Sequence, residues 1–119
     1  MTIYKKNSFG TINITNEALA TLIGRITSEV YGVVGMASRN ILIDGIVELL
    51  KHDNYAKGIV VNSLDDIINI DVYIIVGFGI KVSEVVLQLQ KRIQLEVKNT
   101  LQIDVRQINI FIQGIRVID

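Results

Sequence analysis

The residues best suited to acid–base chemistry are His52 and Asp53, which are adjacent in the sequence. A histidine beside a carboxylate can act as a general base when a substrate proton or nucleophile lies within reach. His52 is the only histidine, the chain has no cysteine, and no serine motif typical of hydrolases accompanies the pair. The pair stands in a polar stretch after a predicted short helix, so we expect a solvated surface histidine and no catalytic residue.

Three carboxylates, Asp65, Asp66 and Asp71, have the oxygen ligands that a hard cation prefers. Asp65 and Asp66 are adjacent and tend to point apart, and the chain has no Asp-x-Asp-x-Asp-Gly loop. A turn stabilised by aspartate side chains bonding to nearby backbone is the favoured interpretation. We therefore expect no metal site and no cofactor.

The segment from Gly77 to Ser83 reads as the end of a strand, a glycine turn and the start of a helix. A phosphate could bind the free amides near Ser83, with Lys81 beside it. The segment lacks the third glycine of a dinucleotide-binding fingerprint and the Gly-Lys-Ser/Thr ending of a P-loop. We expect a tight turn with Ser83 as the N-cap, and a small-ligand sensor remains an alternative function.

Four basic residues could bind the phosphates of RNA, three on a predicted long helix and one beyond it: Lys91, Arg92, Lys98 and Arg106. Glu84 and Glu96 share that helix, and 12 basic residues balance 12 acidic ones over the whole chain. No Gly-x-x-Gly loop or aromatic stacking platform accompanies the basic residues. A solvated helix face is therefore expected and nucleic acid binding is not, although a small RNA-binding domain of KH-like topology remains the second functional hypothesis.

The elements that position these residues follow from hydrophobic periodicity over the 119 residues. We predict helices over residues 16–29 and 84–99, a short helix over 44–50, and strands over 9–14, 31–37, 58–62, 67–76 and 108–112. Residues 1–8 are expected to be a disordered N-terminus of a single domain spanning 1–119. No apolar run approaches the roughly 20 residues needed to span a bilayer, and the N-terminus lacks a secretory signal, which predicts a cytoplasmic protein.

The predicted order is β-α-β-(short α)-β-β-α-β. Such an order in a short chain favours an α+β fold, a two-layer sandwich with a mixed sheet and both main helices on one face. The strand over 67–76 is apolar on both faces in its second half, which predicts a central position in the sheet.

Two helix faces are candidate surfaces for protein interaction. On the long helix, Leu87, Lys91 and Leu95 repeat every four residues, opposite the predicted core stripe. On the first helix, small or polar residues occupy the face opposite its core: Thr21, Gly24 and Ser28. Two exposed leucines on one line indicate a contact patch, and we expect a homo-oligomer formed through it.

Four segments resemble the alkaline shock protein family of Gram-positive-type bacteria, in the order seen in that family. They are the stretches from Gly10 to Thr15, Tyr31 to Ala37, Asp71 to Gly79 and Val105 to Ile115, and the resemblance covers about Ser8 to Val117. One departure is that Thr100 is followed by Leu101, where relatives carry a glycine that ends the helix. Asn99 or Gln102 is expected to end the helix instead.

The resemblance implies a cytoplasmic protein linked to envelope stress, associated with the membrane through a protein partner such as an anchor. No enzymatic reaction is associated with the family. Together with the lack of a convergent catalytic set, this predicts a non-enzymatic interaction or scaffold protein.

Overall fold

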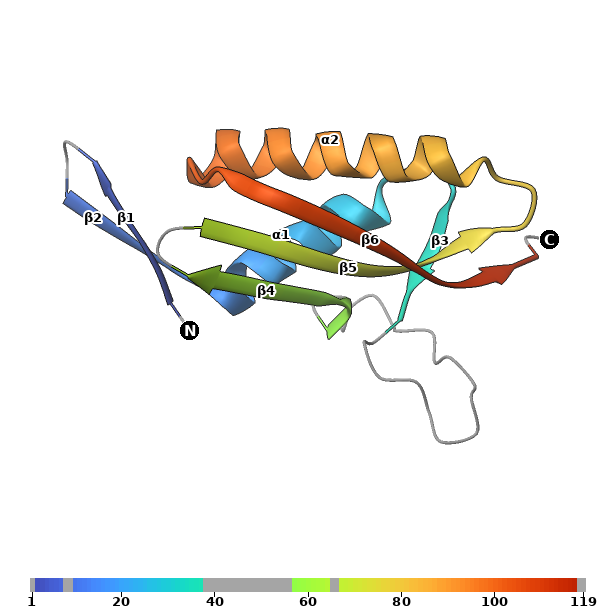
Figure 1. Cartoon of the computed structure of the whole chain (residues 1–119), viewed down its shortest axis with the longest axis horizontal. Coiled ribbons are helices and arrows are strands. Elements are labelled where there is room, and N and C mark those ends of the chain that lie inside the picture. Colours follow the sequence, from blue (N-terminus) through green and yellow to red (C-terminus); the bar gives the residue numbers. More distant parts are fainter. Residues whose placement is uncertain (1, 8–9, 38–56, 65–66, 118–119) are drawn as a thin grey trace.

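The computed structural model describes residues 2–7, 10–37, 57–64 and 67–117. Two helices and six strands follow one another in these residues, an α+β fold as predicted (Figure 1). The helices are α1 (Asn16–Ser28) and α2 (Val82–Leu101). The strands are β1 (Thr2–Asn7), β2 (Gly10–Thr15), β3 (Val33–Met36), β4 (Ile59–Leu64), β5 (Ile67–Gly77) and β6 (Val105–Arg116).

Strand β5 is the centre of the main sheet, in agreement with its apolar sequence. Strand β6 runs parallel to it along one edge, from Ile68 paired with Val105 to Gly77 paired with Arg116. Strands β4 and β3 pair antiparallel with successive parts of the other edge. The sheet is therefore mixed, as expected, with β3 and β4 sharing one edge of β5.

Both helices pack on the same face of this sheet. Alternate residues of β5 point to that face and are buried in the core: Ile68, Ile70, Val72, Ile74 and Val76. The same cluster contains Leu19, Ile23 and Ile26 of α1 together with Val85, Leu89, Ile93 and Val97 of α2. In Figure 1, α2 runs alongside β6, and α1 lies behind β5 towards β4. This side of the sheet therefore holds the core, and the outer faces of the two helices are left for other contacts.

The ends of α2 differ from the prediction at one end and agree at the other. Ser83 is not the N-cap: Lys81 takes that position, and its backbone carbonyl accepts hydrogen bonds from the N–H groups of Glu84 and Val85. At the other end Gln102 has a left-handed backbone, with φ of 57°, and its N–H bonds to the carbonyl of Lys98. Gln102 thus ends the helix, one of the two residues expected to do so.

At the N-terminal end, residues 2–7 of the segment for which we expected disorder form strand β1. Strand β1 pairs antiparallel with β2, from Thr2 opposite Thr15 to Asn7 opposite Gly10. The pairing satisfies the backbone groups of a segment too polar to be recognised as a strand from its side chains. The predicted short helix over 44–50 lies outside the described residues.

Candidate interaction surface

The outward face of α2 carries two exposed leucines with a lysine between them. Leu87 is 52% exposed and Leu95 is 61% exposed. Their orientation is set by Val85, Leu89, Ile93 and Val97, which recur every four residues and are all buried. Lys91 is exposed as well, and no ion pair of Lys91 is found within the described residues. We call Leu87, Lys91 and Leu95 the leucine stripe.

The face predicted on α1 is smaller than expected. Thr21 is exposed, and its hydroxyl donates to the Glu17 carbonyl, while the Ser28 hydroxyl donates to the Arg25 carbonyl. Gly24, in contrast, is buried, so it does not belong to the outer face. It falls between Ala20 and Thr27 on a second buried row beside the core. The remaining polar residues are engaged by their own helix, so α1 offers less to a partner than α2 does.

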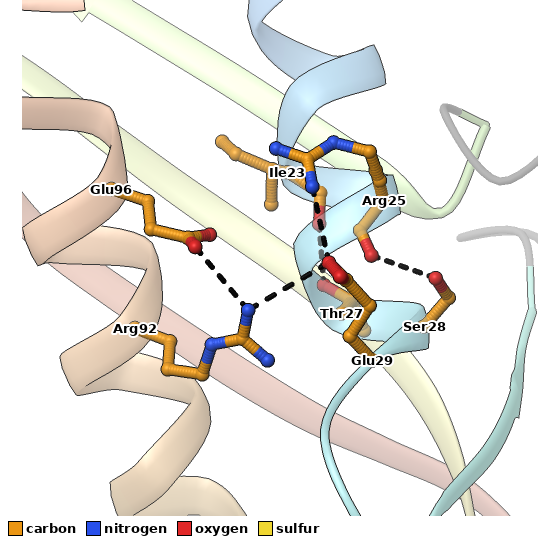
Figure 2. Close-up of polar contacts among 7 residues, drawn as sticks. All are labelled: Ile23, Arg25, Thr27, Ser28, Glu29, Arg92 and Glu96. Atoms are coloured by element: carbon orange, nitrogen blue, oxygen red, sulfur yellow. Dashed lines mark hydrogen bonds and ion pairs between the residues drawn. The ribbon is translucent and has the colours of Figure 1, made fainter. Parts of the chain in front are cut away.

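The basic residues of α2 are divided among separate partners. Arg92 lies between Glu29, beyond the end of α1, and Glu96 on its own helix, with N···O distances of 3.7 Å and 3.3 Å (Figure 2). Lys98 contacts Asp104 at 2.8 Å. Arg106 is exposed on β6 beside a polar hollow lined by Gln90, Gln94, Val105 and Ile108. The predicted basic positions therefore do not gather into one phosphate-binding surface.

The turn from Gly77 to Ser83 adjoins a hollow of about 290 Å³. Residues on both sides line it: Tyr31, Gly79, Ile80, Lys81, Glu84, Val85 and Gln88. Lys81 forms an exposed ion pair with Glu84 at 3.6 Å. An anion at the start of α2 would therefore meet a carboxylate as well as the free amides, which weakens the small-ligand hypothesis.

Asp71 points to the face of the sheet opposite the helices. One of its oxygens accepts a hydrogen bond of 2.9 Å from the Asn109 side chain, and Gln107 donates to Asn109 at 3.0 Å. Beside them the rings of Tyr73 and Phe111 stack with centroids 4.9 Å apart. Asp71 is thus part of a polar ladder between β5 and β6. His52, Asp53, Asp65 and Asp66 lie outside the described residues.

An apolar end of the sheet is a surface that the sequence analysis missed. Four exposed residues from three segments lie there: Tyr31, Phe78, Ile115 and Val117. Backbone hydrogen bonds join these segments, from the Gly77 N–H to the Gly32 carbonyl and from the Phe78 N–H to the Arg116 carbonyl. The three segments are far apart in the sequence, so only the pairing of the strands reveals the group.

The sequence matches one family of proteins and is similar to several bacterial proteins. Residues 4–117 match the alkaline shock protein 23 family, described as having a cell envelope-related function. The uncharacterized protein YloU of Bacillus subtilis is 39% identical over 117 residues, covering 98% of each chain. The uncharacterized protein Spy1614 of Streptococcus pyogenes is 36% identical over 118 residues, covering 99% of this chain and 98% of the relative.

A second Bacillus subtilis protein, the uncharacterized protein YqhY, is 34% identical over 113 residues, covering 95% of this chain and 82% of the relative. No solved structure matches the chain. Within the residues that the structure describes, neither α1 nor α2 is long and apolar enough to cross a membrane.

Proposed function

The chain belongs to the alkaline shock protein 23 family, whose function is cell envelope-related, and on that premise we propose that it is a non-enzymatic scaffold. In this role it works in the cytoplasm, close to the membrane, and binds a protein partner that anchors it there. Its task is to hold other proteins together near the envelope.

The observation that carries this proposal is the leucine stripe. The side chains of Leu87 and Leu95 are more than half exposed, although α2 is fixed firmly by four buried residues on its other face. An apolar row on a rigid helix loses unfavourable contact with water when a partner covers it. Arg92, next to the stripe on the same helix, forms ion pairs with Glu29 and Glu96 of this chain. Its charge is therefore already neutralised within the chain and does not need an acidic group on a partner.

Lys91 indicates what kind of partner fits the stripe. If two copies packed their α2 helices antiparallel around the centre of the stripe, Lys91 would face Lys91 of the second copy. Like charges in contact oppose that arrangement. A different protein that presents apolar side chains on either side of an Asp or Glu fits better, because its carboxylate would meet Lys91.

Fractionation of the native cells tests the proposal. We expect the wild-type protein to sediment in part with membranes and to co-purify with one partner after cross-linking. The double variant Leu87→Glu, Leu95→Glu should stay folded and lose both properties, because each change places a carboxylate in the contact. Gln88→Glu, an exposed change on the same helix, is the matched control and should retain both.

Two results would contradict the proposal. One is a double variant that still co-purifies with the same partner at the wild-type level. The other is RNA binding with a sub-micromolar Kd at physiological salt, since nonspecific binding is expected at about 10⁻⁴ M or weaker for so balanced a charge.

A further inference from the structure

Strand β6 has one edge that no strand pairs with among the described residues. Its other edge is hydrogen-bonded to β5. The backbone N–H and C=O groups of successive residues of β5 point alternately to its two neighbours, and this alternation shows which backbone groups of β6 point away from β5. The Tyr73 carbonyl accepts the Ala37 N–H on the β3 side, so the backbone groups of Val72 and Ile74 point to β6. In a parallel pair, a residue whose backbone groups point to the neighbouring strand bonds to the residues on either side of its register partner, so the backbone groups of the partner itself point away. The register partners of Val72 and Ile74 are Ile110 and Ile112, whose N–H and C=O groups therefore point to the free edge. By the same alternation Ile108 also points outward.

The contact of Gln90 agrees with this assignment. Its side chain on α2 reaches the strand and donates a hydrogen bond of 2.9 Å to the Ile108 carbonyl. The N–H and C=O groups of Ile110 and Ile112 remain at the edge. Regular pairing with β5 runs from Gln107 to Ile112, because the register shifts beyond each of these residues. The edge thus presents one short stretch of regular strand between two irregular ends.

We propose that two copies of this chain pair through this edge, with their β6 strands antiparallel and Ile110 facing Ile110 of the second copy. In that register Ile108 faces Ile112 of the second copy. Each of the three residues whose backbone groups point to the free edge therefore faces such a residue of the other copy. Each facing pair can exchange two N–H···O=C hydrogen bonds. The Ile108 carbonyl keeps its bond to Gln90, because a carbonyl oxygen accepts two.

Charge and side-chain type favour this register. Centring the pair on Phe111 would place Arg106 opposite Arg116 of the second copy, and like charges directly opposite are destabilising. Centring on Ile110 places Arg106 opposite a glycine, Gly114 of the second copy. The half-buried Ile108, Ile110 and Ile112 would form a continuous apolar row beneath the two α2 helices.

This pairing gives the expected homo-oligomer a surface separate from the leucine stripe. It leaves Leu87, Lys91 and Leu95 free for the partner described above, so either proposal can fail alone. A dimeric scaffold would present that stripe twice, which raises its apparent affinity for a membrane-bound partner.

Single-cysteine variants test the pairing sharply, because the chain has no cysteine of its own. We expect Ile110→Cys to form a covalent dimer with a short bismaleimide at micromolar protein concentration. Lys91→Cys is the matched variant for pairing through α2 and should give little dimer. Efficient cross-linking at position 91 with none at position 110 would overturn the proposal in favour of the helix surface.

Amide hydrogen exchange of the unmodified protein gives a second measurement that needs no substitution. The amides of Ile110 and Ile112 should exchange at least about tenfold more slowly when the protein concentration is raised well above the dimer Kd. The amides of Asn109 and Phe111 face β5 and should change little. Exchange at Ile110 and Ile112 that is independent of concentration, together with a monomer in sedimentation at high concentration, would refute the pairing.

A proline substitution separates the dimer from the fold. Ile110→Pro removes an outward N–H, so the β5–β6 ladder keeps its hydrogen bonds while the contact between copies loses two. We expect a folded monomer by circular dichroism and sedimentation. A variant that is folded and still dimeric would count against β6 as the interface.

Discussion

The guanidinium of Arg92 on α2 reaches the Glu29 carboxylate, 3.7 Å away, and thereby ties the second helix to the end of the first. Arg25 donates to the same Glu29 oxygen at 3.1 Å, and Arg92 also contacts Glu96 (Figure 2). One carboxylate therefore joins two arginines from different helices. The contact joins the two helices at the surface, beside the buried residues of α2 that set the direction of the leucine stripe.

Arg92→Gln should lower the free energy of unfolding by about 0.5–1 kcal/mol. The loss is small because the Arg92 and Glu29 side chains are 37% and 45% exposed, and such pairs are screened by water. Urea titration at low salt measures this loss of stability. Lys91→Gln is the control, because it also removes a positive charge from α2, but one that has no ion pair among the described residues. The difference between the two variants should shrink near 1 M salt. A difference that persists there would mean that Arg92 acts through packing.

Two glycines of the described residues have a positive φ, and they should respond differently to substitution by alanine. Gly32 has φ of +97°, and a Cβ there would lie 2.7 Å from a Val85 methyl and 2.8 Å from an Ile80 methyl. Gly79 has φ of +84° but nothing within 4 Å of the added atom. We expect Gly79→Ala to cost about 1–2 kcal/mol from backbone strain, and Gly32→Ala to cost about 1–3 kcal/mol more from crowding. Chemical denaturation of both variants measures this, and equal losses would contradict the close approach of α2 to Gly32.

Replacing the residue that ends α2 should stabilise the protein. Gln102 has a left-handed backbone that is unfavourable for a residue with a Cβ. Gln102→Gly should therefore raise the free energy of unfolding by about 0.5–1 kcal/mol, since glycine adopts this conformation without strain. Thermal unfolding followed by circular dichroism tests it. Asn99→Gly, which places glycine inside the helix, should instead destabilise by a similar amount.

Periodicity in the sequence was enough to place both helices and the central strand. Val85, Leu89, Ile93 and Val97 repeat every four residues, so their burial and the exposure of Leu95 follow from helix geometry. The sequence left Asn99 and Gln102 as alternatives for the residue that ends α2, and the structure has Gln102 there.

Features that depend on contacts between distant segments could not be predicted. Gly24 has no side chain to contribute to an apolar pattern, so nothing in the sequence marks it as buried. Strand β1 contains two lysines, and the feature that identifies it as a strand is its backbone pairing with β2. The polar group of Asp71 and Asn109 requires the parallel register of β5 and β6, which a sequence of separate strands does not specify.

The same substitution at two leucines of α2 should have very different consequences for stability. Leu95 is 61% exposed and Leu89 is fully buried, although both lie on one helix. Leu95→Glu leaves its carboxylate in water and should change the free energy of unfolding by no more than about 0.5 kcal/mol. Leu89→Glu places a charge in the core and should cost more than about 4 kcal/mol, enough to unfold a domain of this size.

Thermal unfolding at low protein concentration makes this comparison without interference from self-association. We expect Leu95→Glu to melt within a few degrees of the wild type, while Leu89→Glu shows no cooperative transition. If Leu95→Glu instead loses more than about 2 kcal/mol, a loss that surface substitutions rarely cause, the leucine is packed inside the protein and the stripe is not a binding surface. If it is neutral, any loss of partner binding by Leu95→Glu reports the contact itself, because the fold that presents the stripe is unchanged.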